Sequence, residues 1–313
     1  MTTSKEVSSR FWNLPHKAEE EVARENTFID DIIQKDHIEK LLLSSLDGIH
    51  TVFDGGAGCG RFSILLAKHG LHVTHFDISQ TMIDKAKQMA ERETVADNIV
   101  FAHGSLEELN HIKDKQFDLV LSIDAPISYT YPKQAEVIGN LIRIASKRLI
   151  LSVYSRLGWI PYQFSPAQKA QYILDKNTSD SFARWVLDYA VKTVPSYLPN
   201  MEEVHNTYTS GLMERPEVTY AAYEKGETPW PVSYGFMPDE LLSIFHSNGI
   251  KNVMLSGPGA LSRSIPNEVL VNIMNDCERK REFLDFCYLF DSQPWCAGMG
   301  KDNLVARAEL DDL

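Results

Sequence analysis

The sequence has few cysteines, and none of them is placed for metal binding or dithiol chemistry. Its 313 residues include four, Cys59, Cys277, Cys287 and Cys296, and no two of these form a C-x-x-C pair. Zinc knuckles and thioredoxin-type redox sites require such pairs. We therefore expect reduced thiols, most of them packed in the interior.

Long apolar runs are also missing. No stretch of eighteen apolar residues occurs, so we expect no membrane-spanning helix. The N-terminus, MTTSKEVSSRFWNLPHKAEEEVARE, lacks the apolar segment of a secretory signal. Both absences predict a cytoplasmic protein without a membrane partner.

Positive charge is in deficit. The chain has 31 Lys and Arg against 43 Asp and Glu, a formal net charge of −12. Its longest basic clusters are Lys147-Arg148 and Arg279-Lys280-Arg281. Proteins that bind nucleic acids neutralise phosphates with a basic surface, so this composition disfavours a nucleic-acid partner without excluding one.

Residues 51–155 alternate between short strands and helices. The pattern predicts strands at TVFD, LHVTHFD, NIVFAHG, FDLVLSID and RLILSVY, and helices at RFSILLAKHG, SQTMIDKAKQMAERE and KQAEVIGNLIRIA. FDLVLSID is apolar on both faces, as a buried parallel strand is. Five strands joined by short crossover helices predict a doubly wound, mostly parallel α/β sheet.

The flanking regions have different patterns. Residues 17–46 have apolar residues at helical spacing and predict one helix. Residues 156–232 are rich in Tyr, Trp, Pro and Ser, and we expect helices near 165–175 and 179–192. After them, MPDELLSIFHSNGI predicts a helix, KNVMLS and NLVARAEL predict strands, and 265–290 predicts more helix.

These patterns predict an interrupted sheet that resumes near the C-terminus. The segment between its two parts is expected to cap the ligand edge of the sheet. The expected organisation is an N-terminal helical lid at 1–46, a ligand-binding core at 47–155, a cap insertion forming the substrate pocket at 156–232, and the rest of the core sheet at 233–313.

The stretch VFDGGAGCGRF places four glycines in six positions between the first strand and its helix. A dinucleotide site needs G-x-G-x-x-G. Counted from Gly56 the third glycine position holds Arg61, and counted from Gly55 the second holds Ala57. Moreover, Asp54 directly precedes the loop and would repel a pyrophosphate. A ligand with an ammonium and a sulfonium but no phosphate suits this acid, and glycines let the backbone approach it closely. The alternative is a tight turn without a ligand.

Four stretches, VFDGGAGCGRFSILLAKHG, HVTHFDIS, HGSLEEL and FDLVLSIDAPI, resemble in order and spacing the class I S-adenosylmethionine-dependent methyltransferases. The resemblance covers 51–155 well, 233–257 and 302–310 in part, and 156–232 not at all. It implies a Rossmann-like sheet of seven mostly parallel strands, with an N-terminal helical segment and an α-rich cap insertion. It also implies S-adenosyl-L-methionine as the cofactor.

The resemblance assigns cofactor contacts position by position. Asp77 matches the acid that accepts both ribose hydroxyls, although capping the following helix is an alternative role. Ile78 and Met82 match positions that flank the adenine. Many members have Asp where this sequence has Ser105, so the base contact falls to Ser105 or to a backbone amide. The implied cofactor-binding residues are Asp54, Gly55, Gly56, Gly58, Gly60, Asp77, Ile78, Met82, Gly104, Ser105, Leu106, Ile123 and Asp124.

Methyl transfer is an in-line displacement that needs alignment, exclusion of water and, for some acceptors, removal of a proton. It requires no metal, and we expect none. The candidate catalytic residues, Asp124 and Tyr129, follow the fourth strand. Asp124 either holds a cationic or hydroxyl acceptor, accepts a proton, contacts the cofactor ammonium or serves as a turn acid. Tyr129 either acts on the acceptor or is a packing residue. The sequence DAPI departs from the NPPY of amino-group DNA and protein-glutamine methyltransferases, which argues against those substrates.

The candidate acceptor-binding residues are Trp12, Tyr129, Tyr131, Trp159 and Tyr162. Trp12 either covers the cofactor as a lid or fixes the N-terminal tail to the sheet. The aromatic residues of the insertion either enclose an apolar, aromatic or cationic acceptor or form a small satellite core. They are Trp159, Tyr162, Tyr172, Trp185, Tyr189, Tyr197, Tyr208 and Trp230. His205, in the same segment, is either a general base or a surface residue.

The sequence thus predicts an S-adenosylmethionine-dependent methyltransferase. Its expected acceptor is an N, O, S or C atom of a small molecule, and its expected state is a monomer or a homodimer. The alternatives are an RNA or protein methyltransferase, a non-catalytic S-adenosylmethionine-binding protein, and an enzyme that uses the sulfonium compound for lysis or alkyl transfer.

Overall fold

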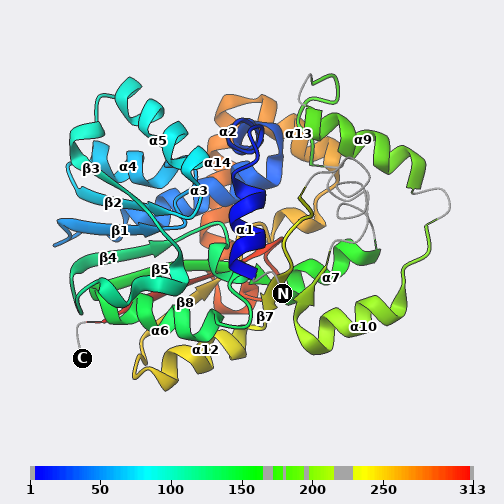
Figure 1. Ribbon diagram of the computed structural model, residues 1–313. Coiled ribbons are helices and arrows are strands. Elements are labelled where there is room, and N and C mark those ends of the chain that lie inside the picture. Colours follow the sequence, from blue (N-terminus) through cyan, green and yellow to red (C-terminus); the bar gives the residue numbers. More distant parts are fainter. Residues whose placement is uncertain (1–3, 165–171, 179–180, 194–196, 215–227, 311–313) are drawn as a thin grey trace.

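The structure is a computed structural model that describes residues 4–164, 172–178, 181–193, 197–214 and 228–310 (Figure 1). A central sheet contains all seven predicted strands, in the order β3-β2-β1-β4-β5-β9-β8. The first five are parallel to one another, and β9 is antiparallel to both of its neighbours. The seven strands are β1 (Thr51–Gly55), β2 (His72–Asp77), β3 (Ile99–His103), β4 (Phe117–Ser122), β5 (Ala145–Ser155), β8 (Val253–Ser256) and β9 (Asn303–Glu309).

Two short strands that the sequence did not predict extend this sheet at β5. β5 pairs with β4 as far as Leu151, and its last residues, Tyr154 and Ser155, pair instead with β7 (Ser233–Phe236). β6 (Leu212–Met213) then pairs antiparallel with β7. β5 has 11 residues and runs past the end of β4, so its unpaired backbone can accept another strand.

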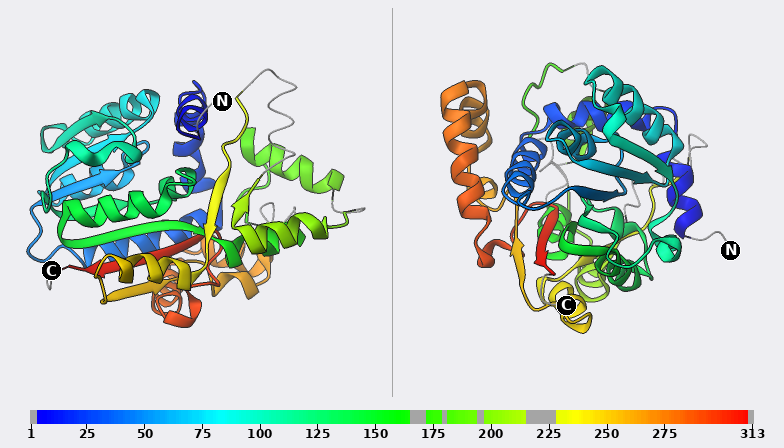
Figure 2. Two further views of the ribbon diagram at one scale, coloured as in Figure 1. Left: turned by 60° about the horizontal axis from the view of Figure 1, so that its bottom comes forward. Right: turned by 90° about the vertical axis from the view of Figure 1, so that its left-hand side faces the viewer.

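Helices cover both faces of the sheet because neighbouring strand residues point to opposite faces. Val52 contributes to a core with α3 and α4, whereas Phe53 contributes to a core with α6 and α12 on the other face. α14 packs outside α3 (Figure 2). The helices are α3 (Ile29–Leu43), α4 (Arg61–Lys68), α5 (Gln80–Arg92), α6 (Gln134–Ile144), α12 (Pro238–Ser247), α13 (Asn267–Asn275) and α14 (Cys277–Asp291), with 3-10 turns η1 (Ala96–Asn98), η2 (Leu106–His111), η3 (Pro126–Tyr129), η5 (Ser262–Ser264) and η6 (Pro294–Cys296).

The N-terminal region contains a break that its sequence did not predict. Residues 17–46 form two helices, α2 (Lys17–Thr27) and α3, and the prediction of one helix was wrong at Phe28. Phe28 is extended and fully buried, and it pairs with Ile173 in an isolated β-bridge. The amide of Ile29 also donates to the carbonyl of Tyr172 (2.7 Å). Pairing with a distant segment therefore overrides the local helical pattern.

The described part of the segment after β5 contains three helices, and the first begins at the carboxyl end of that strand (Figure 1). It contains α7 (Arg156–Phe164), α9 (Ser181–Thr193) and α10 (Met201–Ser210). α9 confirms the helix predicted near 179–192, whereas most of the one predicted near 165–175 lies outside the described residues. Arg156 is buried, and it donates to the carbonyls of Tyr208 and Gly235 and pairs with Glu240 (2.7 Å), which ties this segment to β7 and α12.

Two expectations from composition can be compared with this fold. No helix among the described residues combines the length and apolarity that crossing a bilayer requires. All four cysteines lie in the described part of the chain and form no disulfide. Cys59, Cys287 and Cys296 are buried and Cys277 is exposed, so most of the thiols are packed as expected.

Candidate active site

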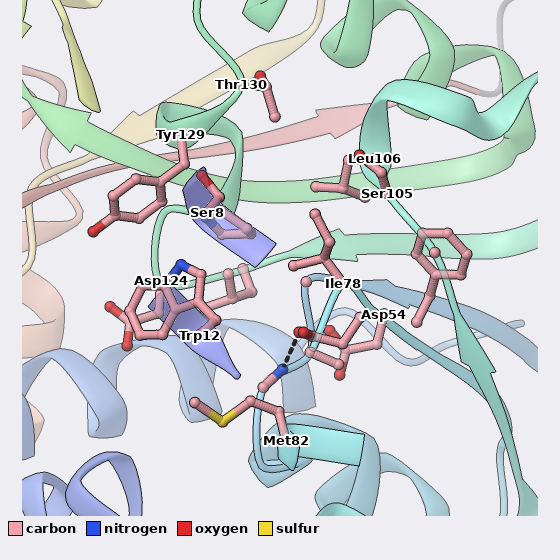
Figure 3. A pocket seen from close by; sticks show the side chains of 18 of the residues that line it. Ser8, Trp12, Asp54, Ile78, Met82, Ser105, Leu106, Asp124, Tyr129 and Thr130 are labelled. Carbon is pink, nitrogen blue, oxygen red and sulfur yellow. Dashed lines mark hydrogen bonds between the residues drawn. The ribbon is translucent and has the colours of Figure 1, made fainter. Parts of the chain in front are cut away.

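A cavity of about 150 Å³ lies at the carboxyl ends of β1, β2 and β4 and is covered by α1 (Ser4–Trp12). Figure 3 shows Trp12, Asp124 and Tyr129 on one side of it and Ser105 and Leu106 on the other. Trp12 of α1 lines it, as the lid alternative predicted, whereas Lys5, Ser8, Pro126 and Thr130 also line it and were not among the predicted site residues. The predicted cofactor-binding residues that line it are Asp54, Gly56, Gly58, Asp77, Ile78, Met82, Gly104, Ser105, Leu106, Ile123 and Asp124.

The glycine loop brings its backbone close to neighbouring elements. Gly56 has φ +73°, and a Cβ there would lie 2.4 Å from Pro126 Cβ. Gly60 has φ +83°, and a Cβ there would lie 2.9 Å from Ala86 Cβ. Gly60 and Gly55 do not line the cavity. The close approach of α5 accounts for the glycine at position 60 without any ligand contact.

Asp77 fixes the loop through two backbone amides. Its Oδ2 accepts from Gly58 N and its Oδ1 from Ser79 N, each at 2.8 Å. Burial raises the pKa of Asp77, and these two hydrogen bonds oppose the rise. An ionised carboxylate offers about four lone-pair sites, so two remain for a ligand. The helix-capping alternative belongs to Ser79 instead, whose Oγ accepts from Met82 N (3.2 Å).

Asp54 lies on an inner chain of polar groups that the sequence did not reveal. Its Oδ2 accepts from Ser63 Oγ at 2.7 Å, and Ser63 Oγ lies 3.1 Å from His75 Nδ1. Burial raises the pKa of Asp54 to about 6, against the Ser63 hydrogen bond and with a smaller contribution from the charge of Asp77. Burial lowers the pKa of His75 to about 4, so this imidazole is neutral at neutral pH.

The raised pKa of Asp54 predicts that the variant Asp54→Asn gains stability, relative to the natural protein, as pH rises. The Asp54 carboxyl group holds its proton more tightly in the folded protein than in the unfolded chain. Protonated Asp54 therefore contributes fully to stability below the unfolded pKa of about 3.8, and this contribution is lost as pH rises through about 6. We expect the difference in the free energy of unfolding, variant minus natural protein, to be about 2 kcal/mol larger near pH 8 than near pH 4. The variant thus gains relative stability as pH rises.

Urea denaturation at the two pH values measures this difference. Asp291 also has a pKa raised to about 6 by burial, but it is present in both proteins and cancels in the comparison. A difference between the two proteins that stays constant across this range would contradict the prediction.

Asp124 is part of a strained turn at the end of β4. Asp124 and Ala125 have φ values of +67° and +69°, which are uncommon for residues other than glycine. The amide of Asp124 donates to Ser152 Oγ (2.7 Å) and holds this backbone in place. The Asp124 carboxylate forms an ion pair with Arg24 of α2. The candidate acid therefore has a basic partner that the sequence did not predict.

Arg24 gathers three carboxylates at this position. Besides Asp124, its guanidinium lies 3.3 Å from Glu21 and 3.6 Å from Asp31. Burial acts to lower the pKa of Arg24, but the negative charges of Asp124, Glu21 and Asp31 outweigh it and hold the pKa well above its usual value. Burial raises the pKa of Glu21. In the sequence, the only sign of this ion cluster was that KAEEEVARENT has too few apolar residues for a helix packed within the core.

A second cavity, of about 380 Å³, adjoins the first, and Glu21 and Asp124 line both. It lies among α2, α3, β9 and the helices that follow β5. The hydroxyl of Tyr129 in the first cavity is 2.7 Å from that of Tyr154 in the second. Trp230 Nε1, also in the second cavity, donates to Tyr129 Oη at 3.3 Å. The two tyrosine hydroxyls thus stand between the cavities.

The predicted acceptor-binding residues are divided between these cavities. Trp12 lines the first and contacts Tyr129 edge-on, with ring centroids 5.7 Å apart. Tyr131 lines neither, since it is partly exposed and stacks on Tyr234. Besides Tyr154, the aromatic residues that line the second cavity are Trp159, Tyr162, Trp185, Tyr197 and Trp230.

The remaining candidates of the insertion have other surroundings. Tyr172 is buried in a cluster with α3, α13 and α14, as the satellite-core alternative predicted. Tyr208 and His205 are exposed on α10 and line neither cavity. The side chain of Tyr189 lies outside the described part of the structure.

Residues 52–147 match a family model described as a methyltransferase domain. This match, together with the glycine loop and its acids, supports the predicted resemblance of this region to the class I S-adenosylmethionine-dependent methyltransferases. The chain is 38% identical over 109 residues to the chloroplastic magnesium protoporphyrin IX methyltransferase of Arabidopsis thaliana. The matched residues are 34% of this chain and 33% of that one. It is 39% identical over 70 residues to the tRNA 5-carboxymethoxyuridine methyltransferase of Escherichia coli K12, which is 22% of this chain and 27% of that one.

The sequence similarity to these curated relatives is confined to part of each protein. The chain spans about a third or less of the length of these curated relatives. Among solved structures, magnesium protoporphyrin IX methyltransferase from Synechocystis PCC 6803, with bound S-adenosylhomocysteine, aligns with a TM-score of 0.45 and 17% identity over 90% of this chain and 85% of that one.

Proposed function

We propose that this protein transfers the methyl group of S-adenosyl-L-methionine to a small-molecule acceptor. The observation that carries the proposal is the pair of adjoining cavities, one at the glycine loop and one among aromatic side chains, with Glu21 and Asp124 shared between them. A donor and an acceptor bound in adjoining cavities can meet at the shared wall, which is what a direct displacement requires.

The first cavity has the chemistry to bind the cofactor. The free lone pairs of Asp77 suit a vicinal diol, and Ile78 and Met82 provide an apolar surface for a base. Asp54 brings negative charge to the side where the ammonium and sulfonium would lie. A side chain at Gly56 would collide with Pro126, so the backbone is bare at this point. When bound, the cofactor supplies a methyl group activated by its sulfonium.

The residues around the shared wall would orient the acceptor and exclude water. Trp12 and Ser8 of α1 cover the first cavity, so α1 acts as a lid in this proposal. The Tyr129 and Tyr154 hydroxyls place a donor and acceptor pair between the two cavities. Asp124, held by Arg24, would position a polar group of the acceptor rather than act as an isolated base.

Titration calorimetry with S-adenosylmethionine, followed by transfer of a labelled methyl group to small-molecule acceptors, tests the proposal. We expect binding and release of S-adenosylhomocysteine. Binding without release in any acceptor panel would favour the non-catalytic alternative. Labelling of tRNA but not of small molecules would favour the RNA alternative, which the net charge of −12 disfavours. Absence of cofactor binding would refute the proposal.

The variant Tyr129→Phe is expected to lower kcat about tenfold, because it removes one hydroxyl of the pair between the cavities. The affinity for S-adenosylmethionine should stay within about twofold, since the ring remains. Tyr131→Phe is the matched control: it removes a tyrosine hydroxyl two positions away, from a side chain that lines neither cavity. Steady-state kinetics compare the variants, and equal rates for both would contradict the role given to Tyr129.

A further inference from the structure

The second cavity has an excess of negative charge among its described lining residues. Seven carboxylate side chains and two basic side chains line it. A concave, weakly screened surface of one sign raises the local concentration of ligands of the opposite sign. The carboxylates are those of Glu20, Glu21, Asp31, Asp124, Glu203, Glu214 and Asp302, and the basic residues are Lys17 and Arg24.

Both basic side chains already have carboxylate partners. Lys17 Nζ lies 2.7 Å from Glu20 and over the rings of Phe11 and Trp230, at 4.6 and 5.3 Å. Arg24 lies among Glu21, Asp31 and Asp124, as described above. An anionic acceptor would therefore have to compete with these carboxylates and would meet the others at close range, so the cavity disfavours acids and phosphates as acceptors.

The polar atoms of the walls favour a ligand that donates hydrogen bonds. Asn303 is 2% exposed, and its Oδ1 has no hydrogen-bond partner among the described residues. Gln163 Oε1 and Tyr162 Oη likewise have no hydrogen-bond partner among the described residues. Two of these three atoms are acceptors only, and a buried acceptor without a partner is costly unless a ligand supplies the donor.

The aromatic side chains of the second cavity are also compatible with a positively charged ligand. Trp159, Trp185 and Trp230 line the cavity with Tyr162 and Tyr197. Indole and phenol faces attract ammonium groups through the negative face of the ring, and they also cover apolar groups. Carboxylates, carbonyl oxygens and aromatic faces together recognise one kind of ligand, an organic cation with an apolar body.

Given the proposed function, we propose that the acceptor is a small amine that enters the second cavity as an ammonium ion and is methylated on nitrogen. The ammonium first gives a proton to the Glu21 carboxylate, which lines both cavities. The free nitrogen pair then attacks the methyl carbon, the carbon–sulfur bond breaks with its electrons going to sulfur, and a methylated ammonium and neutral S-adenosylhomocysteine result. Burial raises the pKa of Glu21, which suits it to take up a proton.

Three probes of similar size and different charge test this assignment: phenethylamine, phenethyl alcohol and phenylpropionate. Each is titrated into the protein saturated with S-adenosylhomocysteine. We expect the amine to bind at least about tenfold more tightly than the alcohol, and the carboxylate to bind most weakly. Tighter binding of the alcohol or the carboxylate, or no binding of the amine, would overturn the inference. S-adenosylmethionine binding is measured separately, so failure of the amine preference alone leaves the proposed function intact.

A pair of neighbouring variants tests the role of charge. Glu203 of α10 lines the cavity, whereas Glu202 beside it is exposed and does not. We expect Glu203→Gln to raise the Kd for phenethylamine about tenfold and Glu202→Gln to leave it unchanged. Neither variant should change the Kd for phenethyl alcohol. An equal loss of amine and alcohol affinity in Glu203→Gln would indicate a structural role and would contradict the inference.

Discussion

Replacing Asp77 with Asn is expected to weaken S-adenosylmethionine binding about 100-fold. The amide keeps the size of the side chain, but it turns one of the two oxygens that hold Gly58 N and Ser79 N into a donor. It also removes the charge available to a ribose diol. Two charge-assisted hydrogen bonds of about 1.5 kcal/mol each account for an effect of this size.

Calorimetric titration measures this loss. Asp97→Asn is the control, because Asp97 is exposed in η1 and lines neither cavity. It should leave the affinity unchanged. A loss below about threefold in Asp77→Asn, with the fold intact by circular dichroism, would mean that Asp77 only shapes the loop.

Replacing Arg24 with Met is expected to lower the free energy of unfolding by about 3 kcal/mol. The substitution leaves Glu21, Asp31 and Asp124 close together without the guanidinium that compensates them. Removing one partner of a partly buried ion cluster costs more than the cluster contributes, because the remaining charges stay desolvated. The repulsion should also separate α2 from the end of β4 and lower activity.

Urea denaturation at neutral pH measures the effect, and Arg279→Met is its control. The side chain of Arg279 is 71% exposed in its pair with Glu282, so its loss should change stability by less than about 0.5 kcal/mol. Adding Asp124→Asn to Arg24→Met should restore part of the stability, because one repelling charge is removed. Equal stability of Arg24→Met and Arg279→Met would refute the importance of the cluster.

The sheet was predictable because each of its main strands carries its own signal. FDLVLSID and RLILSVY are apolar on both faces, and burial between two helical layers is the environment that such strands require. The glycine loop was predictable for a similar reason, since strand, acid, glycines and helix follow one another directly. Eleven of the predicted cofactor-binding residues line one cavity because the carboxyl ends of parallel strands meet at one edge of the sheet.

Residues whose neighbours are distant in sequence were not predictable in this way. Phe28 interrupts a helical pattern because Ile173 pairs with its backbone. Arg24 lies on a charged helix whose sequence does not reveal that Asp124, at the end of β4, is its partner. Tyr131 and Trp159 have equal standing as aromatic residues in the sequence, yet Trp159 lines a cavity and Tyr131 packs on Tyr234.

The sequence by itself determined the order of strands and helices in the core, the glycine loop after β1 and the acids beside it. These depend on hydrophobic periodicity, backbone freedom at glycine and residue order, which act over a few residues. The tertiary structure decided where the N-terminal helices lie, which acids share Arg24, and that carboxylates and aromatic rings meet in the second cavity. Such groups are far apart along the chain, and their energies depend on distance and burial, which only folding sets.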